Sequence, residues 1–156
     1  MVPVVELPYV DEHAVTIAAD AETVWRVLGE RIDVAFSHGP VAAFAGVVGC
    51  ESRTASGPRP LAEGSTIPGF RVATAVPDRE LVLRGRHRFS SYALTFRLAT
   101  VGTERTRLAA ETRAAFPGLA GRIYRLFVIG TGGHVVAVRK VLSEVKRRSE
   151  PQPSSL

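Results

Sequence analysis

Residues 92–98, Tyr-Ala-Leu-Thr-Phe-Arg-Leu, and residues 108–116, Leu-Ala-Ala-Glu-Thr-Arg-Ala-Ala-Phe, each alternate between a more apolar and a more polar set of side chains. A period of two is typical of a β-strand with one buried face. Folding the chain about the glycine-containing loop at 101–105 predicts an antiparallel hairpin with Phe96 opposite Ala110. The apolar sets then share one face: Tyr92, Leu94, Phe96 and Leu98 with Leu108, Ala110, Thr112, Ala114 and Phe116.

Further strands are expected before this hairpin. Residues 70–76 also alternate with a period of two, and Pro77-Asp78 is expected to end that strand. The next strand begins at Leu81. His87 lies either on the inner face at the end of this strand or in the turn before Phe89.

A strand and helices are expected in the N-terminal part of the chain. Residues 10–17 are rich in β-branched side chains, which predicts the first strand. Asp20 is a suitable N-cap for a short helix that Gly29 would end. Residues 32–49 predict a second short helix and a connection, and residues 56–64 predict a loop. The apolar face of the first helix consists of Val24, Trp25, Val27 and Leu28.

A long apolar and basic segment extends from Leu119 to about Arg148. At 100° per residue, part of it forms one narrow stripe, which predicts a helix lying across an apolar surface. The stripe consists of Ile123, Phe127, Gly130, His134, Val138, Val141 and Val145. We predict a single domain over residues 1–148 and a disordered tail over residues 149–156.

A strand, two short helices, a run of antiparallel strands and a long terminal helix make an α+β protein. This order resembles the helix-grip fold of the START and birch-pollen-allergen superfamily, in its polyketide cyclase/dehydrase-like branch. The resemblance rests on residues 10–17 running through Ala18-Ala19-Asp20 into a helix with Trp25, on residues 92–96, and on the terminal helix. It implies a curved sheet wrapped around the last helix, with a cavity between them for an apolar small molecule.

The resemblance therefore implies binding of a hydrophobic small molecule or lipid between the sheet and the C-terminal helix. Such sites are mostly apolar and contain a few polar groups. The alternative is a cyclase/dehydrase-type enzyme that acts on a polyketide-like substrate in the same cavity. The residues expected to line the cavity are Phe70, Val72, Tyr92, Leu94, Phe96, Thr112, Phe116, Ile123, Phe127, Gly130 and His134.

His134 is the most distinctive polar residue of the stripe. It is expected to point toward the sheet, where Thr112 and Tyr92 are candidate hydrogen-bond partners. It is either a core histidine bonded to a hydroxyl or a group that contacts ligand or transfers protons. In an enzyme, His134 would act with Tyr92 or His87, so these three are the catalytic candidates.

Glycines 130, 132 and 133 surround His134. Each glycine inside a helix costs about 1 kcal/mol relative to alanine. Three explanations stay open: room for a ligand, a bend or break in the helix, and close packing of the helix on the sheet. The stripe points Gly132 away from the sheet, so backbone shape or an external contact must explain it. The run also imitates a dinucleotide-binding loop, but no strand follows, and no cofactor is predicted.

Composition and charge narrow the possible classes of protein and of binding partner. A chain with 46% hydrophobic and 22% charged residues is typical of a globular protein. A single cysteine and the lack of any His-Glu-x-x-His or Cys-x-x-Cys motif predict neither a disulfide framework nor a metal site. The net charge is +5, of which residues 139–150 contribute +3 (five cations against two anions), and no nucleic-acid partner is predicted. Without a signal sequence or membrane span, we expect a cytoplasmic protein, and the oligomeric state stays open.

Overall fold

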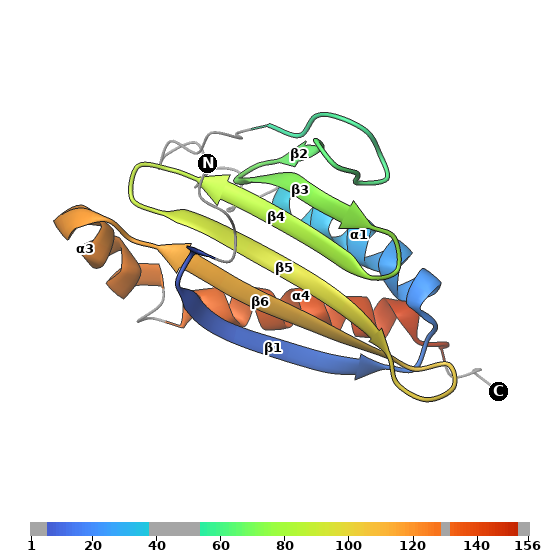
Figure 1. Ribbon diagram of the computed structural model, residues 1–156. Helices are drawn as coiled ribbons and strands as arrows, with labels where there is room; N and C mark the ends of the chain where they lie inside the picture. The colour runs from blue at the N-terminus through green and yellow to red at the C-terminus, as the bar shows by residue number, and fades with distance from the viewer. Residues whose placement is uncertain (1–5, 38–53, 129–131, 153–156) are drawn as a thin grey trace.

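The computed structural model describes residues 6–37, 54–128 and 132–152, apart from the side chains at 37, 127 and 128. Six strands form one antiparallel sheet in the order β1-β6-β5-β4-β3-β2 (Figure 1). The elements are β1 (Tyr9–Ile17), α1 (Ala21–Ser37), β2 (Thr66–Ile67), β3 (Phe70–Val76), β4 (Glu80–Arg86), β5 (Ser91–Thr100), β6 (Thr106–Ala115), α3 (Gly118–Val128) and α4 (Gly133–Ser149). The predicted α+β order is confirmed.

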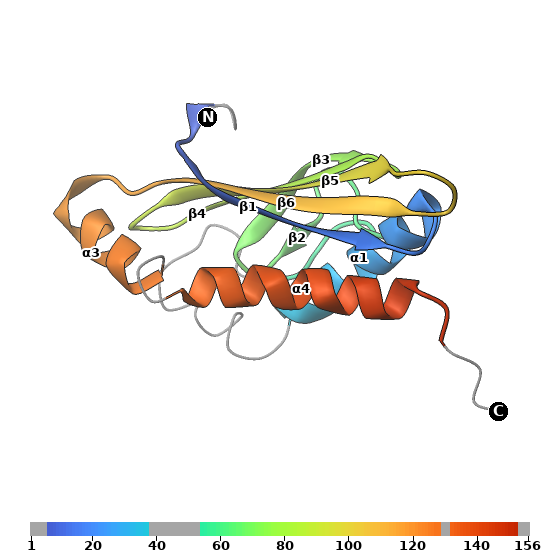
Figure 2. The same ribbon diagram turned by 90° about the horizontal axis from the view of Figure 1, so that it is seen from below.

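The helices α1 and α4 cover the inner face of the curved sheet (Figure 2). The core lies between these helices and the sheet, because the apolar side chains at alternate positions of the strands point toward the helices. Helix α4 contributes Val138, Val141, Leu142 and Val145, all of which are buried. The largest fully buried side chain is Phe96 of β5. Among the described residues, no helix is both long enough and apolar enough to cross a membrane.

The predicted hairpin has the predicted register. In the β5–β6 ladder, Phe96 lies opposite Ala110 and Thr95 lies opposite Glu111. The more polar set of side chains points to the outer face, where Arg97 and Arg113 both form ion pairs with Glu111, at 3.4 and 2.6 Å. The loop at 101–105 and the alternation together specified the register, because a slip of one residue would bury these charges.

Helix α1 is longer than expected. It begins after Asp20, whose Oδ1 accepts a hydrogen bond from the Thr23 N–H at 2.8 Å, as predicted for an N-cap. It does not end at Gly29 but continues to Ser37. The next turn buries Ile32 completely, and this burial outweighs the cost of about 1 kcal/mol for a helical glycine. The predicted second helix falls mostly on residues 38–53, which lie outside the described residues.

The predicted terminal helix is two helices, α3 and α4. Gly132 has a φ of 75°, a left-handed conformation that a helix interior does not contain, and it is the N-cap of α4. Backbone shape therefore explains this glycine. The break also changes the phase of the stripe: Val138, Val141 and Val145 are buried, whereas Ile123 on α3 is 49% exposed.

Candidate functional site

The inner face of the sheet has two chemically different halves. The half nearer the β5–β6 loop carries Leu81, Phe96, Leu98 and Leu108, which are buried in the core under α1 and α4. The half nearer α3 carries aromatic side chains instead, and most of these remain partly exposed. The second half is therefore the candidate site.

Seven ring-bearing residues from six parts of the chain meet in this half. Neighbouring ring centroids lie between 4.6 and 6.2 Å apart, mostly in edge-to-face or tilted arrangements. Only the histidine is buried, and the other six rings are partly exposed. We call this set the aromatic cluster; it consists of Phe36 of α1, Phe70 of β3, His87 and Phe89 of the β4–β5 turn, Tyr92 of β5, Phe116 after β6, and Tyr124 of α3.

Tyr92 is fixed in place by two glycines. Its hydroxyl donates a hydrogen bond to the Gly69 carbonyl oxygen at 2.6 Å. Its ring lies over Gly85, the residue opposite it in the β4–β5 ladder. A Cβ atom at Gly85 would overlap both the Tyr92 ring and the Gly69 carbonyl oxygen. Gly85 therefore shapes the cluster by leaving the space that the ring occupies.

His87 lies in the turn before Phe89, one of its two expected positions, and is buried. The Phe89 N–H donates to His87 Nδ1 at 3.0 Å, so the proton of the neutral ring is on Nε2, which donates to Ser90 Oγ at 3.2 Å. Burial lowers the pKa of His87 below its ordinary value of 6.5. His87 is therefore a neutral residue with both nitrogens hydrogen-bonded within the turn.

His134 has a different partner from the two that were expected. Its Nε2 lies 3.1 Å from both carboxylate oxygens of Asp11 on β1, and His13 Nε2 lies 3.2 Å from one of them. The prediction of Thr112 or Tyr92 was wrong, because the break at Gly132 places His134 in the first turn of α4, beside the β1 edge.

The carboxylate of Asp11 is held ionised by this arrangement. Burial alone would raise its pKa, but the hydrogen bonds and charges of His134 and His13 outweigh burial and lower the pKa below 3.8. Asp11 and Glu12 point to opposite sides of β1, since Asp11 contacts His134 whereas Glu12 pairs with Arg107 on the outer face. Across the ladder from Asp11 is Thr112, whose buried Oγ1 has no hydrogen-bond partner in the described part of the chain.

The residues expected to line a cavity fall into four groups. Val72, Leu94, Phe96 and Thr112 are buried, and Phe70, Tyr92 and Phe116 belong to the aromatic cluster. Ile123 and His134 lie apart, on the exposed face of α3 and beside β1. Gly130 and the Phe127 side chain lie outside the described residues.

Sequence reasoning missed four residues of these sites: Phe36, Phe89, Tyr124 and Asp11. Phe36 was hidden by the early helix end assumed at Gly29. Tyr124 follows Ile123 on α3, and it could have been assigned to the site only if α3 had been recognised as a helix separate from α4.

Within the described ranges, no group of three or more His, Cys, Asp or Glu side chains is arranged to hold a metal ion.

Comparison with known proteins identifies the architecture. No protein-family model and no curated protein sequence matches the chain. Solved structures match it over most of its length. The aromatase/cyclase Zhui from Streptomyces sp. R1128 has a TM-score of 0.56 at 20% identity, covering 92% of this chain and 96% of that one. This chain has the helix-grip fold.

Two other helix-grip structures match at lower identity. Norcoclaurine synthase from Thalictrum flavum, solved in complex with dopamine and hydroxybenzaldehyde, has a TM-score of 0.55 at 13% identity, covering 92% of this chain and 91% of that one. CalU16 from Micromonospora echinospora has a TM-score of 0.54 at 15% identity, covering 91% and 76%. The resemblance predicted from the sequence is confirmed at the level of the helix-grip fold.

Proposed function

We propose that this protein binds an apolar, ring-containing small molecule at the aromatic cluster, between the inner face of the sheet and helix α3. The observation that carries the proposal is the division of the inner face. One half is buried by α1 and α4, whereas the other carries Phe70 and Tyr92 with four aromatic rings of neighbouring segments around them, and all six rings are partly exposed. Aromatic side chains that stay accessible on a concave face are typical of small-molecule sites.

The polar groups near the cluster favour an uncharged ligand with at least one oxygen. Among the described residues, the titratable group buried among the rings is His87, whose pKa burial lowers, so this part of the wall is neutral near pH 7. Thr112 lies two residues along β6 from Ala114, the ladder partner of Tyr92. Its Oγ1, which has no hydrogen-bond partner among the described residues, supports a hydrogen bond to a hydroxyl or carbonyl oxygen of the ligand.

The proposal is tested by titration with prodan, an uncharged naphthalene dye whose emission reports an apolar environment. Tyr124→Ala removes a ring that contacts three other members of the cluster, and we expect it to weaken binding about tenfold or more. Tyr9→Ala is the matched control, because Tyr9 is 57% exposed on β1 and lies outside the cluster. Equal prodan affinity for the two variants would refute the proposal.

A second candidate function, proton transfer on a bound polyketide-like substrate, is favoured by the Asp11–His134 pair. A carboxylate that accepts a hydrogen bond from one imidazole nitrogen fixes the tautomer of the ring and supports an acid/base role for the other nitrogen. If the protein is such an enzyme, His134→Ala abolishes a pH-dependent turnover and leaves prodan affinity unchanged. Turnover that persists in His134→Ala excludes this role.

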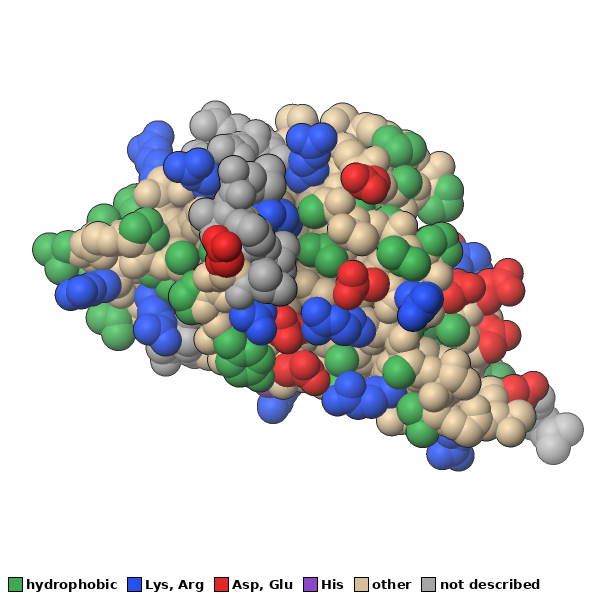
Figure 3. Space-filling view, in the orientation of Figure 1, with side chains coloured by type: hydrophobic (Ala, Val, Ile, Leu, Met, Phe, Trp, Pro, Cys, Tyr) green, Lys and Arg blue, Asp and Glu red, His purple; other side chains and the backbone are tan. Residues whose placement is uncertain are grey.

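We also propose that nucleic acids are not partners, as the charge distribution suggested. Basic and acidic side chains alternate over the outer face of the sheet (Figure 3). Arg97 and Arg107 form ion pairs with acidic side chains of neighbouring strands, and Arg113 pairs with Glu111 on its own strand. Submicromolar binding to DNA or RNA at physiological salt, with a steep salt dependence, would contradict this proposal.

A further inference from the structure

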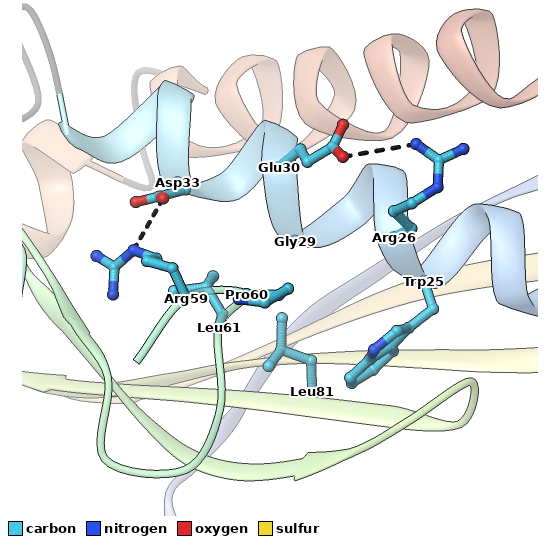
Figure 4. Close-up of a pocket in the computed structure, with 9 residues that line it drawn as sticks. All are labelled: Trp25, Arg26, Gly29, Glu30, Asp33, Arg59, Pro60, Leu61 and Leu81. Carbon is cyan, nitrogen blue, oxygen red and sulfur yellow. Dashed lines mark hydrogen bonds and ion pairs between the residues drawn. The ribbon is translucent and has the colours of Figure 1, made fainter. Parts of the chain in front are cut away.

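A separate pocket lies between α1 and the loop that precedes β2, with a volume of about 460 Å³. Figure 4 shows Trp25 of α1 and Leu81 of β4 on one side, Pro60 and Leu61 of the loop on the other, and Gly29 between them on the helix. The pocket shares no residue with the aromatic cluster. Pockets of this size accommodate small organic molecules.

Gly29 is the unusual residue of this pocket. It lies in the middle of a 17-residue helix, where glycine costs about 1 kcal/mol relative to alanine. Its φ is not left-handed, and a Cβ atom there would have no neighbouring atom within 4 Å. Neither backbone strain nor crowding explains the glycine. Its missing side chain instead leaves the middle of the pocket empty.

The charges at the rim of the pocket are balanced. Arg26 pairs with Glu30 at 3.5 Å, and Arg59 pairs with Asp33 at 2.9 Å. A ligand with a net charge would gain little from a rim that presents both signs in pairs. The Arg59 guanidinium also fixes the loop wall by donating to main-chain carbonyls, those of Ser56, Gly57, Pro58 and Thr66.

We propose that this pocket is a second binding site, for a flat, uncharged aromatic molecule. The Trp25 indole offers a ring face, and Pro60, Leu61 and Leu81 supply apolar walls. The balanced rim selects against charged ligands, and Gly29 keeps the space for the ring open. The site is independent of the function proposed for the aromatic cluster, because the two sets of residues lie on different parts of the sheet and helices.

The test uses 2-naphthol as the probe, since it is flat and uncharged at pH 7. The chain contains one tryptophan, so the indole N–H resonance of Trp25 reports this pocket alone. We expect a saturable shift of that resonance during a titration of the wild-type protein. Gly29→Leu is expected to weaken the binding about tenfold or more by filling the pocket. Gly29→Ala is the matched control and is expected to retain binding.

Stability measurements separate filling from unfolding. Both leucine and alanine are better helix formers than glycine, so neither variant is expected to have a lower melting temperature than wild type. The Tyr124→Ala variant, altered in the aromatic cluster, is expected to keep the Trp25 shift. The proposal is overturned if wild-type protein shows no saturable shift, if Gly29→Leu binds as well as wild type, or if Tyr124→Ala alone abolishes the shift.

Discussion

Gly85→Ala is expected to destabilise the protein by about 2–4 kcal/mol, although it adds a single methyl group. The new Cβ would overlap the Tyr92 ring and the Gly69 carbonyl oxygen, so both the β2–β3 turn and the ring must move. Overpacking of this kind costs about 1–3 kcal/mol. Displacing the ring also breaks the hydrogen bond from the Tyr92 hydroxyl to Gly69, which adds about 1 kcal/mol.

The assay is urea denaturation followed by circular dichroism, with Gly29→Ala as the matched control. The control makes the same chemical change in open helical space, where it is expected to stabilise the protein by up to about 1 kcal/mol. In a Tyr92→Ala background, the cost of Gly85→Ala is expected to fall by about 1 kcal/mol or more. This cost does not fall to zero, because the new Cβ would still overlap the Gly69 carbonyl oxygen. A change below about 0.5 kcal/mol for Gly85→Ala would refute this account of the cluster.

Three further predictions concern the core and the two histidine sites. Phe96→Ala is expected to cost about 3–5 kcal/mol in urea denaturation, because Phe96 is fully buried; a much smaller cost would contradict close packing around the ring. The folded pKa of His87 is lowered, so wild-type stability is complete above pH 6.5 and falls as the pH drops below it. His87→Gln should have a flatter profile between pH 7 and 5, and a profile parallel to wild type would be inconsistent with the buried neutral ring. The folded pKa of Asp11 is also lowered, so its stabilisation is present above pH 3.8 and is lost as the pH falls through the folded value. Asp11→Asn should therefore melt lower than wild type at pH 6 and approach it in acid, whereas equal melting temperatures at pH 6 would exclude a stabilising Asp11–His134 pair.

The strands were predictable because their signal is local. In the β5–β6 hairpin, a period of two specifies which side chains face the core, and with the turn at residues 101–105 the observed pairing of Phe96 with Ala110 follows. The helix ends were less predictable. The effect of Gly29 depends on whether the next turn is buried, and the burial of Ile32 is a property of the sheet and α4 as well as of α1.

The candidate sites were predictable only in part, since they combine residues that are distant in the chain. Phe70, Tyr92 and Phe116 could be assigned to the inner face from their strands. Tyr124 joins them only because the chain breaks near Gly132 and α3 packs against the β4–β5 turn. The same break turns His134 toward Asp11, a residue 123 positions away. A stripe drawn at 100° per residue assumes one continuous helix, so it could not predict the position of Tyr124 or His134.

The most direct test of the proposed function is to locate a bound probe by intermolecular nuclear Overhauser effects. The chain has three tyrosines, of which Tyr92 and Tyr124 belong to the aromatic cluster and Tyr9 lies exposed on β1. With selectively labelled tyrosine rings and saturating prodan, we predict effects from the dye to Tyr92 and Tyr124 and none to Tyr9. Effects confined to Tyr9, or none to any tyrosine while the dye is bound, would contradict the account.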